Sequence, residues 1–180
     1  MKLFILLKKI RNHLIYYIKG GVKYSETIGV KVGDNCRIFT RNFGSEPFLI
    51  KIGDNVTVTT GVQFITHDGS GSLIKDSKGR RYYYAKIEVG NNVMIGVNSI
   101  ILPGVKIHDN VIIAAGSVVS KSIPKNSIVG GVPAKIIGRM DEFSNRALKD
   151  WLTEDNMNFR LSYEERILEI CDSEFKPCLK

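Results

Sequence analysis

Aliphatic residues recur every six positions through the middle of the chain. Divided into sixes from Val89, the sequence has a β-branched aliphatic residue at the first position of each unit: Val89, Ile95, Ile101, Ile107, Ile113 and Val119. The fifth position is small or aliphatic: Val93, Ser99, Val105, Val111, Ser117 and Ile123. A period of six matches neither the 3.6-residue turn of an α-helix nor the two-residue alternation of a strand. The pattern therefore predicts short strands joined by regular corners, with these two columns pointing inward.

The fourth position of the units supports the same prediction. It holds residues that turn the chain: Asn92, Asn98, Gly104, Asn110, Gly116 and Ser122. Asn and Gly tolerate the positive φ of a tight corner. The register also appears upstream, with units that begin at Val32, Ile52, Val58 and Phe64. Such stacked coils form a β-helical prism. Ile38 and Ile52 are 14 residues apart, two more than two units require, so we expect a small bulge near the segment RNFGSEPF.

The repeat is interrupted immediately after His67. In the unit FITHDG this histidine occupies the fourth position, where other units have Asn, Gly or Ser. The next unit would begin at residue 70, yet the register resumes only at Val89. We therefore expect His67 to occupy a corner and an irregular loop to leave the prism at about residues 68–86. Long irregular loops in compact repeats are usually functional or disordered, so His67 is the first candidate for a catalytic residue.

The two ends of the chain have different patterns. Residues 1–20 place apolar side chains at helical spacing and basic side chains between them, so we predict an amphipathic basic helix. Its apolar runs are too short to span a bilayer. Packing on the domain or on a neighbouring subunit is favoured over contact of residues 1–19 with an anionic membrane. Residues 140–180 are charged with helical spacing, and we expect them to cap the prism that residues 21–139 form.

The charge and the cysteines narrow the possible partners. The net charge of +8 suggests an anionic partner, namely nucleic acid, a phosphorylated cofactor or a membrane surface. The sequence contains no recognisable nucleic-acid-binding motif. None of the cysteines belongs to a CxxC pair, so we predict no metal site or disulfide framework, and free thiols in a reducing cytosol.

The tyrosines of the inserted loop, Tyr82–Tyr84, either stack on a sugar or anchor the loop to a neighbouring prism.

The segment from Ile87, IEVGNNVMIGVNSIILPGVKIHDNVIIAAGSVVSKSIPKNSIVGGVPAKIIGRM, resembles the hexapeptide-repeat acyltransferases. The resemblance extends from about Val32 to Arg139, and it is greatest to the galactoside, maltose and nodulation acetyltransferases and to O-acetyltransferases of capsular and lipopolysaccharide sugars. It implies a mainly β fold, a left-handed parallel β-helix flanked by the N-terminal helix and the C-terminal helices. It also implies an acetyl-CoA-dependent transfer to a hydroxyl, in a homotrimer whose active sites lie between adjacent prisms.

The resemblance also implies roles for individual residues. His67 matches the general base of the family, and an imidazole with an ordinary pKa near 6.5 is suited to take a proton from a hydroxyl at neutral pH. Asp68 is its sequence neighbour, but the pattern assigns no partner to the imidazole. The positions that match the coenzyme A site are Ala115, Ser120, Lys121, Lys135 and Arg139. The positions that match the acceptor side are Asn42 and Met94, the latter where the family usually has a tryptophan.

The leading hypothesis is therefore an acetyl-CoA-dependent O-acetyltransferase that acts on a saccharide, such as a cell-surface polysaccharide or its precursor. The same fold would also suit N-acetylation of an amino sugar or O-acetylation of an antibiotic. A third alternative is a prism without catalytic activity that serves as a scaffold. We expect a cytoplasmic protein, with the inner face of the membrane as a peripheral alternative.

Overall fold

The computed structural model describes residues 2–172, 175 and 178 of the chain. Met1 in the expected N-terminal helix, and residues 173–174, 176–177 and 179–180 in the expected C-terminal cap, lie outside the described residues. The chain divides into two compact units, one that ends at Glu142 and one that begins at Phe143. Each unit is described by itself below.

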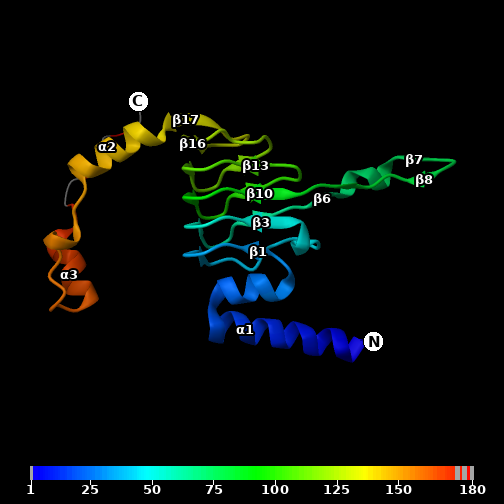
Figure 1. Ribbon diagram of the computed structural model, residues 1–180, viewed down its shortest axis with the longest axis horizontal. Helices are drawn as coiled ribbons and strands as arrows, with labels where there is room; N and C mark the ends of the chain where they lie inside the picture. The colour runs from blue at the N-terminus through cyan, green and yellow to red at the C-terminus, as the bar shows by residue number, and fades with distance from the viewer. Residues whose placement is uncertain (1, 173–174, 176–177, 179–180) are drawn as a thin grey trace. The chain divides into compact units, whose positions relative to one another are not determined.

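Short parallel strands stacked coil on coil form the body of the first unit (Figure 1). The first sheet contains, in order, β1 (Lys31–Val32), β3 (Ile50–Ile52), β10 (Ile87–Val89) and β13 (Lys106–Ile107). The second contains β17 (Lys135–Arg139), β16 (Ser127–Gly130), β14 (Val111–Ile113), β11 (Val93–Ile95), β4 (Thr57–Val58) and β2 (Arg37–Ile38). The third contains β15 (Val118–Val119), β12 (Ile100–Ile101) and β5 (Gln63–Phe64). Val93 pairs with Val111, so one coil consists of three six-residue units, and the predicted β-helical prism is confirmed.

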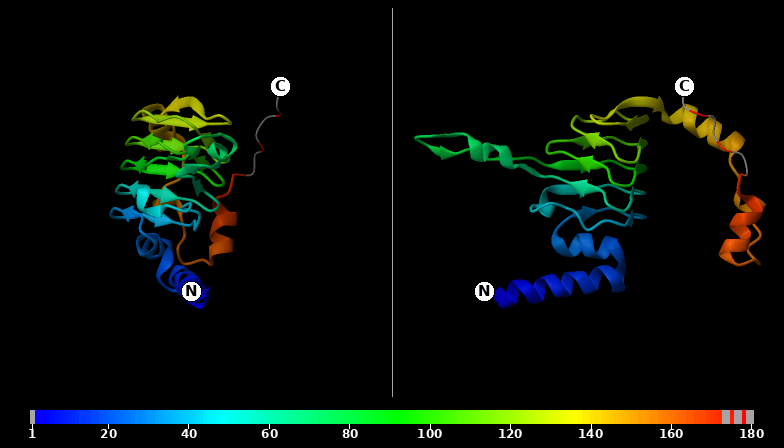
Figure 2. Two further views of the ribbon diagram at one scale, coloured as in Figure 1. Left: turned by 90° about the vertical axis from the view of Figure 1, so that its right-hand side faces the viewer. Right: turned by 180° about the vertical axis from the view of Figure 1, so that it is seen from behind.

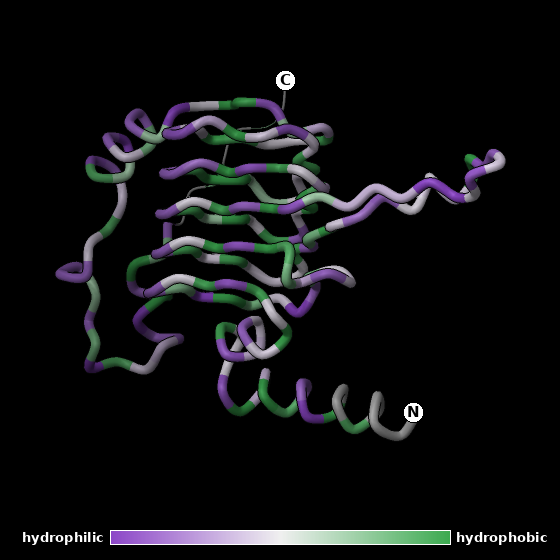
Figure 3. The backbone as a smooth tube through the Cα atoms, turned by 45° about the vertical axis from the view of Figure 1, so that its right-hand side comes forward, coloured by the Kyte–Doolittle hydropathy of each residue, from purple (hydrophilic) through white to green (hydrophobic). Residues whose placement is uncertain are grey.

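The two columns predicted to point inward form the core of the prism. From Val89 to Val119 every first-position residue is at most 3% exposed. The fifth-position residues are buried as well, including Ser99 and Ser117, whose hydroxyls both donate hydrogen bonds to the Ala114 carbonyl. Apolar and polar residues accordingly alternate along each coil (Figure 3). Val32, in the first coil, is only partly buried.

The corners have the backbone conformation that the sequence predicts. The fourth-position residues Asn92, Asn98, Gly104, Asn110 and Gly116 all have positive φ. The side chains of Asn55, Asn92, Asn110 and Asn126 form a ladder of amide hydrogen bonds of 3.0–3.1 Å along one edge of the prism. Ser122 was expected in this column, but it lacks a positive φ because the last coil is two residues shorter, as the pairing of Ile107 with Ile123 shows.

The N-terminal helix is longer than expected and is kinked. α1 spans Lys2–Ile28, and Gly20, with φ 82° and ψ 172°, divides it into two helices, so the predicted prism boundary at residue 21 was wrong. The second part packs under the first coil, where a Cβ on Gly21 would lie 1.8 Å from the Ile38 carbonyl oxygen. In the first part the side chains of five apolar residues are exposed, namely Leu7, Ile10, Leu14, Tyr17 and Ile18. Among the described residues no helix has the length and apolarity that crossing a membrane requires.

The insertion after His67 is a β-hairpin and not an irregular loop. β6 (His67–Asp68) pairs with β9 (Tyr83–Tyr84), and farther out β7 (Lys75–Asp76) pairs with β8 (Gly79–Arg80). A 3-10 turn, η2 (Gly69–Leu73), lies between β6 and β7. The pairing continues into the prism because Ala85 N–H donates to the Thr66 carbonyl. This hairpin arm (residues 67–86) projects from the stack of coils (Figure 2).

The sequence suggested that His67 occupies a corner, but His67 does not adopt a corner conformation. Its backbone is extended within β6, and it lacks the positive φ of the Asn and Gly corners. A left-handed corner at this point would turn the chain back onto the prism. The extended backbone instead lets the strand continue outward into the hairpin arm.

An antiparallel strand ends the second sheet. β17 pairs with β16 and forms the last strand of that sheet, an edge that the predicted helices were expected to cover. The predicted C-terminal helices are present as α2 (Met140–Asp150) and α3 (Tyr163–Ile170), with the short turn η3 (Glu154–Asn156) between them. Their role as a cap remains a prediction.

Candidate active site

His67 is hydrogen-bonded to a carboxylate that the sequence pattern did not assign. Glu46 Oε2 lies 2.9 Å from His67 Nδ1 and accepts a 2.6 Å hydrogen bond from the hydroxyl of Thr66. The Thr66 side chain is buried, the Glu46 side chain is 18% exposed, and the His67 side chain is 40% exposed. The imidazole therefore has one side fixed by the protein and one side open to a ligand.

The bulge expected near RNFGSEPF is what brings Glu46 to this place. Asn42 pairs with Gln63 in the coil above, and Phe43 stacks on Phe64 with ring centroids 5.3 Å apart. Both rings are buried, so this segment is held firmly against the prism. Glu46 directly precedes the 3-10 turn η1 (Pro47–Leu49), at the end of the bulge. The spacing from Ile38 to Ile52, two residues longer than two units, was thus the feature of the sequence that indicated this site.

Hydrogen bonding keeps Glu46 ionised. The bond from Thr66, and next the bond from His67, lower the pKa of Glu46 below its ordinary value. An ionised carboxylate only accepts hydrogen bonds, so Nδ1 of His67 is the nitrogen that carries hydrogen. In the neutral imidazole Nε2 is then the nitrogen without hydrogen, and it can accept a proton from a bound hydroxyl.

Asp68, the sequence neighbour of His67, has a local structural role instead. Its carboxylate accepts a 2.8 Å hydrogen bond from the backbone N–H of Ser70 at the start of η2. This bond lowers the pKa of Asp68. Asp68 therefore supports the base of the hairpin arm, and Glu46 orients the imidazole.

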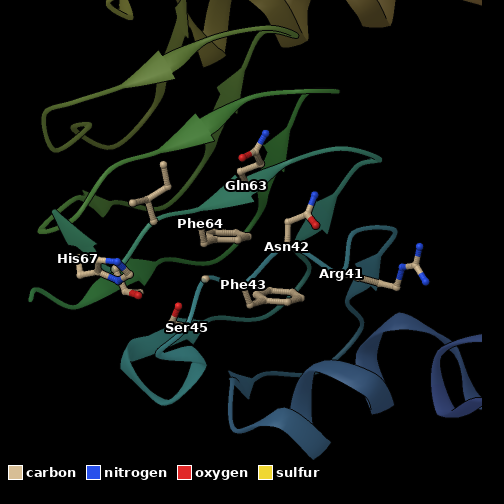
Figure 4. A pocket seen from close by; sticks show the side chains of 10 residues that line it. Arg41, Asn42, Phe43, Ser45, Gln63, Phe64 and His67 are labelled. Carbon is tan, nitrogen blue, oxygen red and sulfur yellow. The ribbon is translucent and has the colours of Figure 1, made fainter. Parts of the chain in front are cut away.

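A hollow of about 360 Å³ opens beside His67. It is lined by the bulge and by the end of β5, and it contains Asn42, Phe64 and His67 (Figure 4). Asn42, expected on the acceptor side, is thus brought together with His67. The volume is within the usual range of small-molecule sites. Arg41, which sequence analysis missed, lies at the opposite end of the hollow from His67, where its guanidinium contacts His13 of α1 at 2.9 Å.

The residues expected to contact coenzyme A lie in the later coils. Ala115 lies between β14 and β15, Ser120 and Lys121 follow β15, and all three are exposed. Lys135 and Arg139 are exposed at the two ends of β17. Arg139 is paired with Asp141 at 2.9 Å, whereas Lys121 and Lys135 form no ion pair within the described part of the chain. Two exposed, unpaired ammonium groups fit a ligand that carries phosphates.

Met94 is not brought to His67 within one chain. It is an exposed residue of β11 in the second sheet, whereas His67 follows β5 of the third sheet. It does not line the hollow beside the imidazole. Its proposed contact with an acceptor would thus need a second copy of the chain and remains a prediction. The described residues contain no group of three or more His, Cys, Asp and Glu side chains placed to hold a metal ion.

Comparisons with known proteins match this architecture. Residues 86–121 match the family model described as bacterial transferase hexapeptide (six repeats), and residues 21–39 match the hexapeptide repeat of succinyl-transferase. The chain is 45% identical over 142 residues to the protein CapG of Staphylococcus aureus, covering 77% of this chain and 80% of CapG. It is 33% identical over 147 residues to the galactoside O-acetyltransferase of Escherichia coli K12, covering 78% and 70%. A solved maltose O-acetyltransferase from Clostridium difficile 630 is 25% identical with a TM-score of 0.50, covering 73% and 83%.

Proposed function

Since this chain belongs to the hexapeptide-repeat acetyltransferases, a family with a left-handed parallel β-helix, we propose that it transfers an acetyl group from acetyl-CoA to a hydroxyl of a saccharide. The observation that carries the proposal is the Glu46–His67 pair at the edge of a ligand-sized hollow. The similarity to galactoside and maltose O-acetyltransferases supports a sugar as the acceptor.

The chemistry that the protein must supply is proton transfer. The thioester of acetyl-CoA is already an activated acyl group, whereas a sugar hydroxyl is a weak nucleophile until its proton is removed. Nε2 of His67 takes that proton as the hydroxyl oxygen attacks the acyl carbon. The positive charge that develops on the imidazole is stabilised by the carboxylate of Glu46 at Nδ1. The proton is then available on Nε2 for the departing thiolate.

Lys121 and Lys135 would hold the phosphates of the co-substrate, and Ala115 and Ser120 would lie along its amide arm. Arg139 would join the two lysines if its exposed ion pair with Asp141 opens, which costs little because solvent screens an exposed pair. We further propose that the enzyme is a cytoplasmic homotrimer, which would let Met94 of one copy approach the hollow of the next. The cytoplasm is where acetyl-CoA is produced in a bacterium.

Acetyl transfer by a His67→Ala variant to a panel of sugars, amino sugars and hydroxyl-bearing antibiotics tests this function. We expect the rate to fall by about 10²- to 10⁴-fold, the range of general base catalysis. His108→Ala is the matched control, because His108 is an exposed histidine that does not line the hollow beside His67. An unchanged rate in His67→Ala would remove His67 as the base. Mass analysis shows which acceptors gain an acetyl group, and removal of that group by mild base distinguishes an ester on a hydroxyl from an amide.

A further inference from the structure

We propose that the hairpin arm (residues 67–86) binds an anionic saccharide chain and directs one of its hydroxyls to His67. This inference rests on the proposed acetyl transfer and specifies the class of acceptor. It predicts an acceptor that is acidic and several sugars long, in preference to a free neutral monosaccharide.

A row of planar side chains leads from the active site along the arm. Tyr84 lies beside His67 with ring centroids 5.7 Å apart, and Tyr82 follows with its ring 6.4 Å from that of Tyr84 and inclined by only 11°. The guanidinium of Arg80 lies 4.9 Å from the centroid of the Tyr82 ring. Arg80 ends β8, Tyr82 lies in the two-residue gap that follows, and Tyr84 belongs to β9. Their mutual contacts place all three on the same face of the hairpin. The row therefore begins at the catalytic imidazole and ends in a cation.

The two intervening residues make contacts within the protein. Arg81 pairs with the carboxylate of Asp76 across the hairpin. The hydroxyl of Tyr83 lies 3.2 Å from the position that a Cβ on Gly104 would take, although the Tyr83 side chain is as exposed as that of Tyr84. Alternate residues thus differ in their contacts within the chain and not in their exposure.

The open row has the groups that a saccharide chain needs. Tyr82 is 65% exposed and Tyr84 is 53% exposed, and their hydroxyls have no hydrogen-bond partner within the described part of the chain. Exposed tyrosines offer rigid ring edges and hydroxyls at a small entropic cost, which suits a ligand covered with hydroxyl groups. Arg80 likewise has no carboxylate within ion-pair distance among the described residues, so its charge is available to a ligand.

The charge of the arm indicates an acidic chain. The arm carries five basic residues, Lys75, Lys78, Arg80, Arg81 and Lys86, against the two acidic residues Asp68 and Asp76, both of which already accept hydrogen bonds within the arm. The carboxylates of an acidic saccharide complement this local excess of positive charge.

The experiment compares three acceptor probes: hexagalacturonate, maltohexaose as the neutral chain of equal length, and monomeric galacturonate. Binding is measured by calorimetry and acetyl transfer by steady-state kinetics, with the full-length protein. We expect hexagalacturonate to bind more tightly than maltohexaose, and its binding to weaken as salt is added. Tyr82→Ala and Arg80→Gln should each weaken hexagalacturonate binding by about tenfold, as for a well-placed aromatic or arginine contact, with little effect on the monomer.

Tyr83→Phe and Lys78→Gln are the matched controls outside the row, and each should change hexagalacturonate binding by less than about twofold. Lys78→Gln removes one positive charge that forms no ion pair among the described residues, so it separates the position of Arg80 from the total charge of the arm. Equal binding of the two hexasaccharides, or equal effects of the variants and their controls, would overturn the proposal. So would dissociation of an oligomer by Tyr82→Ala, which would make the row an interface between copies. Failure of the proposed function is distinct, because no acceptor would be acetylated whatever the binding.

Discussion

At the level of single residues, one hydrogen bond assigns the roles at the active site. Glu46 accepts from His67 Nδ1 and from the hydroxyl of Thr66, and this directs the unprotonated Nε2 of the imidazole outward. A carboxylate in this position fixes the tautomer and the orientation of the ring, and stabilises the imidazolium that forms during the reaction. In the proposed reaction Glu46 is thus a positioning residue that acts through His67.

We predict that Glu46→Gln lowers kcat by about 10²-fold and leaves the KM for acetyl-CoA nearly unchanged, because the amide keeps the size of the side chain but not its charge. Steady-state kinetics over a pH series measures this. Glu88→Gln is the control, since Glu88 is a surface residue paired with Lys106 in the first sheet. A variant that raised KM with an unchanged kcat would assign Glu46 to substrate binding.

The same residue makes folding stability dependent on pH. The pKa of Glu46 is lower in the folded protein than its ordinary value of 4.5, so its carboxylate stabilises the fold fully above that pH. This contribution disappears as the pH falls through the lowered pKa. In urea unfolding between pH 7 and pH 3, we therefore expect Glu46→Gln to lose less stability than the unaltered protein, and a parallel loss in both would contradict the assignment.

At the level of elements, the corners of the coils set the shape of the prism. Asn92 has φ 54°, donates a 3.1 Å side-chain hydrogen bond to Asn110 and accepts one of 3.1 Å from Asn55. A left-handed backbone costs an ordinary side chain about 1–2 kcal/mol, whereas glycine adopts it freely. The ladder of Asn side chains therefore connects successive coils and also explains why the fourth column is restricted in residue type.

Replacing Asn92 separates these two contributions. We expect Asn92→Ala to lower the free energy of unfolding by about 2 kcal/mol, because both the hydrogen bonds and the tolerance of positive φ are lost. Asn92→Gly should cost about 1 kcal/mol, since glycine removes only the hydrogen bonds. Urea denaturation gives both values. Equal losses in the two variants would show that the backbone conformation at this corner contributes nothing.

At the level of the whole molecule, the two parts of α1 differ in whether their apolar side chains pack against the core. Before the kink at Gly20 the helix exposes Leu14, Tyr17 and Ile18. In this part His13 contacts Arg41 of the prism. After the kink, Val22 and Ile28 pack against the core. The favoured expectation of a packed apolar face is thus not met within one chain for residues before the kink. A neighbouring subunit and an anionic membrane remain the two hypotheses for what covers it.

Deletion of residues 1–19 should leave the prism intact. The deletion removes one hydrogen bond and two cation–π contacts of Arg41 and no buried core residue, so we expect the melting temperature to fall by no more than about 8 °C. Calorimetry measures this, and a much larger fall would mean that the helix is part of the core. Light scattering and cosedimentation with anionic vesicles, on both forms of the protein, then distinguish a role in oligomerisation from a role at the membrane.

The sequence by itself determined the inward columns, the Asn and Gly corners, the site of the bulge and the place of His67 next to an insertion. It could do so because within a repeat the neighbours of each residue follow from its position in the period. The resemblance that the repeat carries also led to acetyl transfer and to the family.

Only the tertiary structure decided what lies outside the repeat. The contact of Glu46 with His67, the extended backbone of His67, the row from Tyr84 to Arg80 and the kink at Gly20 all depend on segments that leave the register. In such segments a residue's neighbours are set by long-range packing and pairing, and no local period reports them. For this reason the coils were predictable column by column, whereas the partner of His67 was not.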